Sequence, residues 1–165
     1  MAGMDEPART TFNILFVCTG NTCRSPMAEA VARREIERRG WQHVLVGSAG
    51  VAADDGHPAS PQAVEVARRR GLDLGEHRSR GLTPELVEWA DLILAMSPTQ
   101  LGAVARLGGE HRMALLGDFA AGEAGVGSPV PDPFGGSVEL YEDTIAELEG
   151  LISESLDRLS PILHP

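Results

Sequence analysis

Short apolar runs alternate along the chain with longer stretches whose apolar residues recur every three or four positions. Runs of this kind predict strands, and the longer stretches predict amphipathic helices. The predicted strands cover residues 12–17, 44–46, 92–95 and 113–116. Because strands that alternate with helices form crossover connections, the pattern predicts a parallel sheet covered on both faces. We therefore expect a three-layer α/β/α fold whose four-stranded, doubly wound parallel sheet has the flavodoxin-like order 2-1-3-4.

Several predicted helices begin with a hydroxyl residue followed by proline. The hydroxyl serves as an N-cap acceptor, and proline suits the first helical position, where no N–H partner is needed. Gln100 adds a capping box to one of these starts. A final helix is expected over residues 137–159, where the apolar spacing is three and four. The four hydroxyl-proline pairs are Ser25-Pro26, Ser60-Pro61, Thr83-Pro84 and Ser97-Pro98.

The domain organisation is expected to be simple. Residues 1–12 have no apolar stretch of the signal-peptide type and predict a flexible N-terminal tail. Residues 13–165 contain no repeat or linker and predict a single domain. A chain of 165 residues is long enough to bury a hydrophobic core. Residues 117–136 form a long irregular segment with six glycines and three prolines. An ordered loop of this length is more often functional than accidental.

Charge and cysteine content exclude several classes of protein. The net charge is −10, and all 14 basic residues are arginine, so a nucleic-acid partner is not expected. The arginine clusters at residues 33–34, 38–39 and 68–70 predict solvated helix faces. No apolar run approaches the ~18 residues of a membrane span. Two cysteines are too few for a disulfide scaffold, which favours a cytoplasmic protein with cysteine chemistry. We expect a monomer.

The loop that follows the first predicted strand carries the most specific signal. Cys18 opens this loop, and a predicted helix begins at its other end. Backbone N–H groups at a helix N-terminus bind anions and also stabilise a thiolate, which is the nucleophilic form of cysteine. Arg24 supplies a planar guanidinium that can hold two phosphate oxygens. Gly20 and Asn21 are residues that tolerate the positive φ of a tight turn, and Ser25 is placed to hydrogen-bond the sulfur.

Cys18 has two other interpretations besides an oxyanion site. A lone cysteine at a strand end is often a small buried core residue. A zinc site needs two ligands beyond Cys18 and Cys23, and none of the five histidines has a recognised metal spacing. No metal and no cofactor are therefore expected.

Residues 18–26 resemble the phosphate-binding loop of the low-molecular-weight protein tyrosine phosphatase family. The resemblance extends over residues 13–159 and includes three further motifs. Those motifs are Ser48-Ala49-Gly50, His77-Arg78-Ser79-Arg80 and Asp132-Pro133-Phe134.

The resemblance implies a role for each matching residue. Cys18 would attack phosphorus to form a cysteinyl-phosphate, Arg24 would hold the phosphoryl oxygens, and Asp132 would act as general acid and then as base. Ser48 and His77 would support the loop together with two loop residues. Phosphorylated proteins would be the partners. The implied substrate contacts are Thr19, Gly20, Asn21, Thr22, Cys23, Ser25 and Phe134.

An acid on a separate loop is also expected on physical grounds, because a positioned acid accelerates departure of a poor leaving group by roughly 10²- to 10⁴-fold. Asp132 lies between Pro131 and Pro133, the stiffest part of the irregular segment. Asp118 is the rival candidate and is interpreted as a structural carboxylate. His57 and Asp55 are expected at the rim or in turns.

Two departures from the tyrosine phosphatase pattern bear on specificity. Thr22 stands where a bulky aliphatic residue is usual, and Phe134 is followed by Gly135 instead of a second aromatic residue. Both resemble the protein arginine phosphatase branch, so phosphoarginine is the predicted substrate and phosphotyrosine the alternative. Thr22 also has a plainer interpretation as a spacer that faces away from substrate.

Other functions remain as alternatives. A phosphate-binding module would need no nucleophile or acid, yet Cys18 and Asp132 are both present. A thioredoxin-coupled arsenate reductase needs a further cysteine pair, which the chain does not have. Cys23 is interpreted either as a packing residue or as the partner of Cys18 in a reversible disulfide, as in relatives.

Overall fold

A four-stranded parallel sheet forms the centre of the computed structural model, which describes residues 11–163. Its strand order is β2-β1-β3-β4, as predicted. Most of the predicted N-terminal tail lies outside the described residues. The first strand begins at Phe12, as the apolar pattern predicts, so the tail ends before the expected residue 12. Within residues 11–163, no helix combines the length and the hydropathy needed to span a membrane. The strands are β1 (Phe12–Cys18), β2 (Val44–Gly50), β3 (Leu92–Ala95) and β4 (Met113–Leu115).

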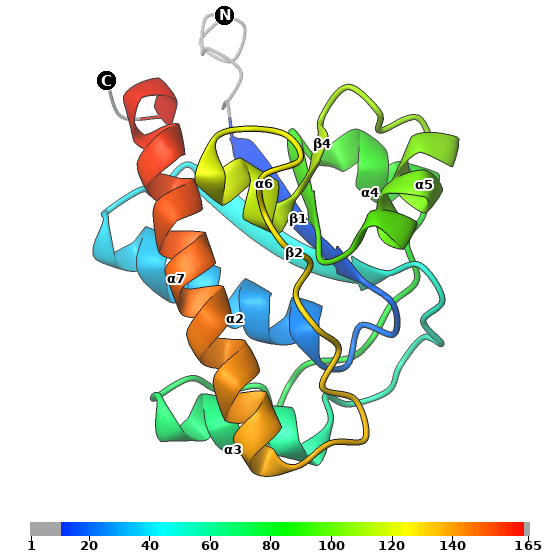
Figure 1. The fold of residues 1–165 in the computed structure, drawn as a ribbon, viewed down its shortest axis with the longest axis vertical. Coiled ribbons are helices and arrows are strands. Elements are labelled where there is room, and N and C mark those ends of the chain that lie inside the picture. Colours follow the sequence, from blue (N-terminus) through cyan, green and yellow to red (C-terminus); the bar gives the residue numbers. More distant parts are fainter. Residues whose placement is uncertain (1–10, 164–165) are drawn as a thin grey trace, which may run out of the picture.

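Helices cover both faces of this sheet and give the predicted three layers (Figure 1). One side carries α2 (Arg24–Arg38), α3 (Pro61–Arg69), α6 (Leu116–Ala121) and α7 (Val138–Leu163), whereas the other carries α4 (Pro84–Trp89) and α5 (Pro98–Arg106).

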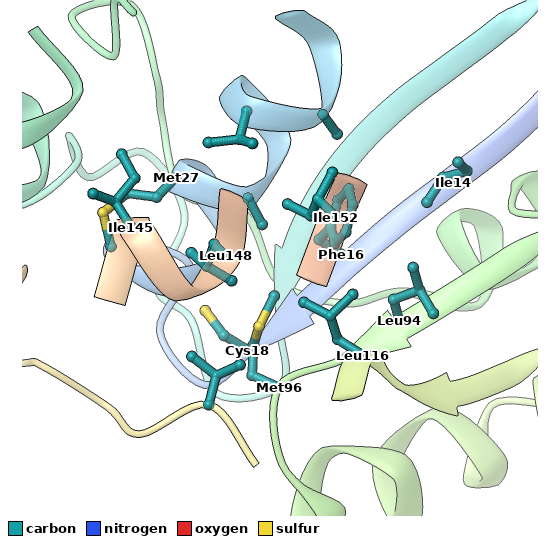
Figure 2. Close-up of a cluster of buried hydrophobic side chains, with 14 of the residues drawn as sticks. Ile14, Phe16, Cys18, Met27, Leu94, Met96, Leu116, Ile145, Leu148 and Ile152 are labelled. Carbon is teal, nitrogen blue, oxygen red and sulfur yellow. The ribbon is translucent and has the colours of Figure 1, made fainter. Parts of the chain in front are cut away.

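Side chains of β1 alternate between the two hydrophobic cores on opposite faces of the sheet. Ile14, Phe16 and Cys18 face the core beneath α2 and α7, and Leu15 and Val17 face the core beneath α4 and α5. All five are buried, and fully burying a large apolar side chain contributes roughly 1.5–3 kcal/mol. Figure 2 shows that Cys18 closes this series at the carboxyl end of β1. The nucleophile candidate is thus anchored by the central strand of the sheet.

Three of the four predicted helix starts are confirmed. Ser60 and Thr83 cap α3 and α4 by accepting from the backbone N–H groups of the third helical residues, and Ser97 precedes α5 with Gln100 in the capping box. The prediction for Ser25 is wrong, because α2 begins at Arg24 and its N-cap is Cys23. The Ser25 hydroxyl faces the phosphate loop instead, where it contacts the Cys18 sulfur.

Some predicted boundaries also differ from the structure. The strand β2 continues to Gly50 and therefore carries Ser48 on the sheet itself. The predicted irregular segment begins with the short helix α6, whose Leu116 and Ala120 are buried. The six-residue length of α6 gives too few periodic positions to be recognised in sequence.

The arginine clusters are only partly the solvated faces that were predicted. Arg34 of α2 and Arg70, which follows α3, both bind the Glu149 carboxylate of α7, at 2.8 and 3.0 Å. Arg70 also binds Glu142 at 2.7 Å. The side chains of Arg34 and Arg70 are 19% and 22% exposed, so these ion pairs join three helices across their packed faces.

Candidate active site

The loop between β1 and α2 places the Cys18 sulfur at the N-terminus of α2. Cys18 is 2% exposed, and its Sγ lies 2.8 Å from Ser25 Oγ. The hydroxyl can donate to a thiolate, and the unpaired N–H groups of the first helical turn add positive potential. This arrangement stabilises an anion at the sulfur.

Asn21 holds the curl of this loop. It is the only non-glycine residue with positive φ (56°) in the described chain, whereas Gly20 does not adopt positive φ. Its Nδ2 donates to Ser25 Oγ at 2.8 Å and to Ser48 Oγ at 3.0 Å. Its Oδ1 accepts from Arg80 N at 2.9 Å. The side-chain amide therefore uses both N–H groups and its carbonyl to fix one loop conformation.

Two further side chains support the same residue from behind. His77 Nε2 lies 2.7 Å from the backbone carbonyl of Asn21, an acceptor, so this ring nitrogen donates. The Ser48 hydroxyl donates a hydrogen bond to Glu29 Oε1 at 2.6 Å, which leaves its oxygen free to accept from Asn21. The structure thus brings Asn21, Ser25, Ser48 and His77 together, as the family resemblance implied.

Gly50 lets the end of β2 approach the loop closely. A Cβ atom at this position would lie 2.5 Å from the Thr19 carbonyl oxygen and 2.9 Å from Asn21 N. Both neighbours are backbone atoms and have no flexible route away. The backbone beyond Gly50 also binds the loop, because Val51 N donates to the Cys18 carbonyl and Ala52 N to the Thr19 carbonyl.

Arg24 points across the loop and is 4% exposed. Its Nη1 donates to the Val130 carbonyl at 2.9 Å, and its Nη2 lies 3.4 Å from Thr19 Oγ1. The same Nη2 is 3.6 Å from Asp132 Oδ2. The buried guanidinium therefore joins the phosphate loop to the segment that carries the acid candidate.

Asp132 lies on the open side of the site. Its side chain is 49% exposed, and its Oδ1 accepts from Phe134 N at 3.1 Å. Phe134 itself is 74% exposed. An acid in this position can reach a group that departs towards solvent.

A pocket of about 200 Å³ connects these groups. Thr22 belongs to its lining, which argues against the interpretation that this residue faces away from substrate. Asn21 and Ser25, which were expected to contact substrate, are fully buried and do not line the pocket. The lining residues are Cys18, Thr19, Gly20, Thr22, Cys23, Arg24, Asp132 and Phe134.

The remaining candidates lie outside this pocket. Asp118 Oδ1 accepts from Gly127 N at 2.8 Å and so holds the irregular segment, in agreement with a structural role. Asp55 Oδ1 accepts from Gly81 N at 2.8 Å, and His57 is exposed.

Cys23 contacts a buried tyrosine at the start of α7. Its Sγ lies 3.1 Å from Tyr141 Oη and 3.5 Å from Ser60 Oγ. Burial, together with the neighbouring Cys23 thiol, raises the pKa of Tyr141 to about 12. The phenol therefore stays protonated and can donate to this sulfur at neutral pH.

Sequence reasoning missed several residues that support the site. Glu29 and Tyr141 contact Ser48 and Cys23 from positions 19 and 118 residues away in sequence. Arg80 belongs to the motif at residues 77–80 but had no predicted role, and its backbone N–H donates to Asn21 Oδ1. Gln100 was expected only as a capping residue. No local pattern marks Glu29, Tyr141 or Gln100 as part of the site.

Known proteins of one family match the chain over most of its length. Residues 13–161 match the family described as low molecular weight phosphotyrosine protein phosphatase. A protein-arginine-phosphatase of Bacillus subtilis is 44% identical over 149 residues, which cover 89% of this chain and 96% of that protein. The low molecular weight protein-tyrosine-phosphatase Etp of Escherichia coli is 36% identical, covering 93% of this chain and 99% of that protein.

A solved structure agrees with these matches. It is a YwlE arginine phosphatase mutant with a phosphorylated active-site serine, and it matches this fold with a TM-score of 0.84 at 41% identity. The match covers 90% of this chain and 96% of the solved one. The chain therefore belongs to the low molecular weight phosphotyrosine protein phosphatase family.

Proposed function

We propose that this protein is a protein arginine phosphatase that acts through a cysteinyl-phosphate. One observation carries the proposal: a single pocket is lined by the Cys18 thiol, the Arg24 guanidinium and the Asp132 carboxylate. A nucleophile, an anion-binding group and an acid are the parts that phosphoryl transfer to a thiol requires.

In the first step the Cys18 thiolate attacks phosphorus, an S–P bond forms, and the P–N bond of phosphoarginine breaks. Asp132 gives its proton to the leaving guanidine nitrogen. Arg24 and the N–H groups of the loop bind the phosphoryl oxygens, on which negative charge is concentrated.

In the second step water attacks phosphorus. The Asp132 carboxylate takes a proton from this water, the S–P bond breaks, and inorganic phosphate leaves with the thiolate regenerated. No redox change occurs in either step, so turnover needs no external reductant.

The shape of the pocket mouth supports arginine as the leaving group. Thr22 brings a branched side chain with a hydroxyl into the lining, and Phe134 is the one aromatic side chain there. Gly135, with φ of 80°, follows Phe134 and leaves the second flank open. Such a mouth holds a flat phenyl ring on one side only, whereas a guanidinium presents N–H donors to Asp132.

The proposal is tested by comparing kcat/KM on phosphoarginine, phosphotyrosine and phosphoserine peptides of one sequence. We expect the phosphoarginine peptide to be hydrolysed fastest. Thr22→Ile should shift the ratio towards phosphotyrosine, with Thr99→Val as a control at an exposed position of α5. Faster hydrolysis of phosphotyrosine by the unmodified chain would overturn the arginine assignment and favour the tyrosine alternative.

We also propose that Cys18 and Cys23 form a reversible disulfide under oxidation by peroxide. Both cysteines are free in this structure and both line the pocket. Peroxide converts the Cys18 thiolate to a sulfenic acid with release of hydroxide, and the Cys23 thiol then displaces water to form the S–S bond.

Mass spectrometry of peroxide-treated protein tests this disulfide. We expect an internal cross-link that dithiothreitol reverses, together with recovery of activity, and loss of that recovery in Cys23→Ala. Sulfinic or sulfonic acid at Cys18 without any cross-link would contradict the proposal.

A further inference from the structure

Gln100 is a fully buried polar residue close to the phosphate loop. It lies in the first turn of α5 and has 0% exposed surface. Its side chain makes three hydrogen bonds, one of which leaves its own element and reaches the loop that begins at Cys18. Capping alone accounts for the other two.

The partners of Gln100 fix the orientation of its amide. Oε1 accepts from Met96 N at 2.9 Å and from Ser97 N at 3.0 Å. Both partners are backbone donors, so the oxygen must face them and the NH₂ group must face away. Nε2 therefore donates to Thr19 Oγ1, which lies 3.2 Å from it.

Thr19 receives a second donor from the opposite side. Arg24 Nη2 lies 3.4 Å from the same Oγ1. A hydroxyl has two acceptor lone pairs and one hydrogen, so two incoming donors leave its own O–H for an acceptor. Thr19 lines the pocket beside Cys18 and Arg24, where the proposed substrate places phosphoryl oxygens.

We infer that Gln100 is a positioning residue that forces the Thr19 hydroxyl to donate to the phosphoryl group of the substrate. The inference rests on the proposed function and adds to it one substrate contact and the buried amide that orients this contact.

The segment after β3 positions Arg24 as well. Met96 O accepts from Val130 N at 2.9 Å, and Val130 O accepts from Arg24 Nη1. Gln100 binds Met96 N and, through Thr19, reaches Arg24 Nη2. The two terminal nitrogens of the Arg24 guanidinium are therefore both connected to the backbone at Met96. Nη1 is connected through Val130, and Nη2 through Thr19 and Gln100.

Calorimetric titration with inorganic phosphate tests the inference independently of which phosphoprotein is the substrate. We expect Thr19→Val to weaken phosphate binding by roughly tenfold, as for loss of a hydrogen bond to a charged group. Thr19→Ser keeps the hydroxyl and should recover most of this loss. Thr99→Val changes an exposed threonine of α5, the helix that carries Gln100, and should bind phosphate as the unmodified chain does.

Gln100→Glu separates positioning from helix capping. A carboxylate still accepts from Met96 N and Ser97 N, but it has no N–H for Thr19, whose hydroxyl then turns to donate to it. The negative charge of the carboxylate also weakens phosphate binding, and this electrostatic effect remains in Thr19→Val, which has no hydroxyl at position 19. We therefore expect Gln100→Glu to weaken phosphate binding several-fold more in the unmodified chain than in a Thr19→Val background. Both backgrounds carry the same buried carboxylate, so its cost to folding affects both sides of this comparison.

The outcomes distinguish this inference from the proposed function. If the unmodified chain binds no phosphate, both fail. The inference fails and the proposed function stands in two cases, both in a chain that binds phosphate. In the first, the phosphate affinity of Thr19→Val is within twofold of that of the unmodified chain. In the second, Gln100→Glu weakens phosphate binding equally in the unmodified chain and in the Thr19→Val background. Kinetics on p-nitrophenyl phosphate should agree, with Thr19→Val raising KM more than it lowers kcat.

Discussion

The phosphate loop depends on one non-glycine residue with positive φ. Asn21 has φ of 56°. This conformation costs most non-glycine residues roughly 1–2 kcal/mol, and asparagine is one of the few types that adopt it more often. Hydrogen bonds to Ser25, Ser48, Arg80 and His77 offset that cost. These contacts therefore hold the loop in one conformation at the residue where it turns.

Two substitutions at this position separate backbone from side chain. Asn21→Gly removes the side-chain amide, but glycine adopts positive φ without penalty. Asn21→Ala also removes the amide, and alanine adopts positive φ only at a cost. We expect kcat/KM on p-nitrophenyl phosphate to fall at least about tenfold in both variants, and Asn21→Ala to be less stable than Asn21→Gly by roughly 1 kcal/mol in urea unfolding. Equal activity of Asn21→Gly and the unmodified chain would show that the network does not control the loop.

Tyr141 gives a direct optical test of burial at the site. It is the one tyrosine of the chain, so phenolate absorbance in an alkaline titration reports on it alone. We expect a midpoint near pH 12 in the folded protein and near 10 in urea.

The same shift predicts how stability depends on pH. Because the folded pKa is above the unfolded one, the folded state retains its proton longer. This contribution is complete below pH 10 and is lost as pH rises towards 12. A folded-state midpoint near 10 would contradict the burial of this hydroxyl against Cys23.

At the scale of elements, hydroxyl-proline pairs locate helix starts where the hydroxyl has no stronger partner. Ser60 and Thr83 cap their helices as the sequence predicts. Ser25 does not, because the loop curls until its hydroxyl meets Cys18 and Asn21. The prediction failed at this functional position because a tertiary contact replaced the local one.

Thr83 is a cap without a role in the site, which makes it a suitable test of this argument. Its Oγ1 accepts from Leu86 N at 3.2 Å. Thr83→Ala should lower the free energy of unfolding by about 1 kcal/mol and leave kcat/KM unchanged, while Thr83→Ser should be nearly neutral. Denaturant titration measures the free energy of unfolding, and kinetics on the same preparations measure kcat/KM. A loss of activity would show that α4 and the active site, which lie on opposite faces of the sheet, are coupled.

At the scale of the whole molecule, the long-range contacts decide what could be predicted. Alternating strands and helices predict the parallel, doubly wound sheet, and the loop motif identifies Cys18 and Arg24. Contacts such as Cys23 with Tyr141 join residues 118 apart, and periodicity shows only that such a residue is buried. Such long-range pairs depend on how α7 packs against α2, and this packing cannot be read from the local pattern of one sequence.

The ion pairs between α2, α3 and α7 are a second property of the whole molecule. Burial by itself raises the pKa of Glu149, but the hydrogen bonds and charges of Arg34 and Arg70 together outweigh it and lower this pKa below its ordinary value. Since the folded pKa is the lower one, this stabilisation is present above about pH 4.5 and is lost as pH falls through the folded value.

Glu149→Gln should therefore lower the free energy of unfolding at pH 7 by roughly 1 kcal/mol, a value reduced by partial exposure of the pair. The difference from the unmodified chain should shrink below about pH 4.5. Glu154→Gln, at an exposed position of the same helix, is the matched control. A difference that is the same at pH 3 and pH 7 would rule out the ion pairs as its source.

Covalent capture of phosphate tests the central claim most directly. In Asp132→Asn, p-nitrophenyl phosphate still has a good leaving group, but the water of the second step has no base, so the intermediate should accumulate. Rapid quenching followed by tandem mass spectrometry should find one phosphate on Cys18, and none in Cys18→Ala. Turnover without any phosphate on Cys18, or phosphate on another residue that turns over at the rate of hydrolysis, would contradict the account.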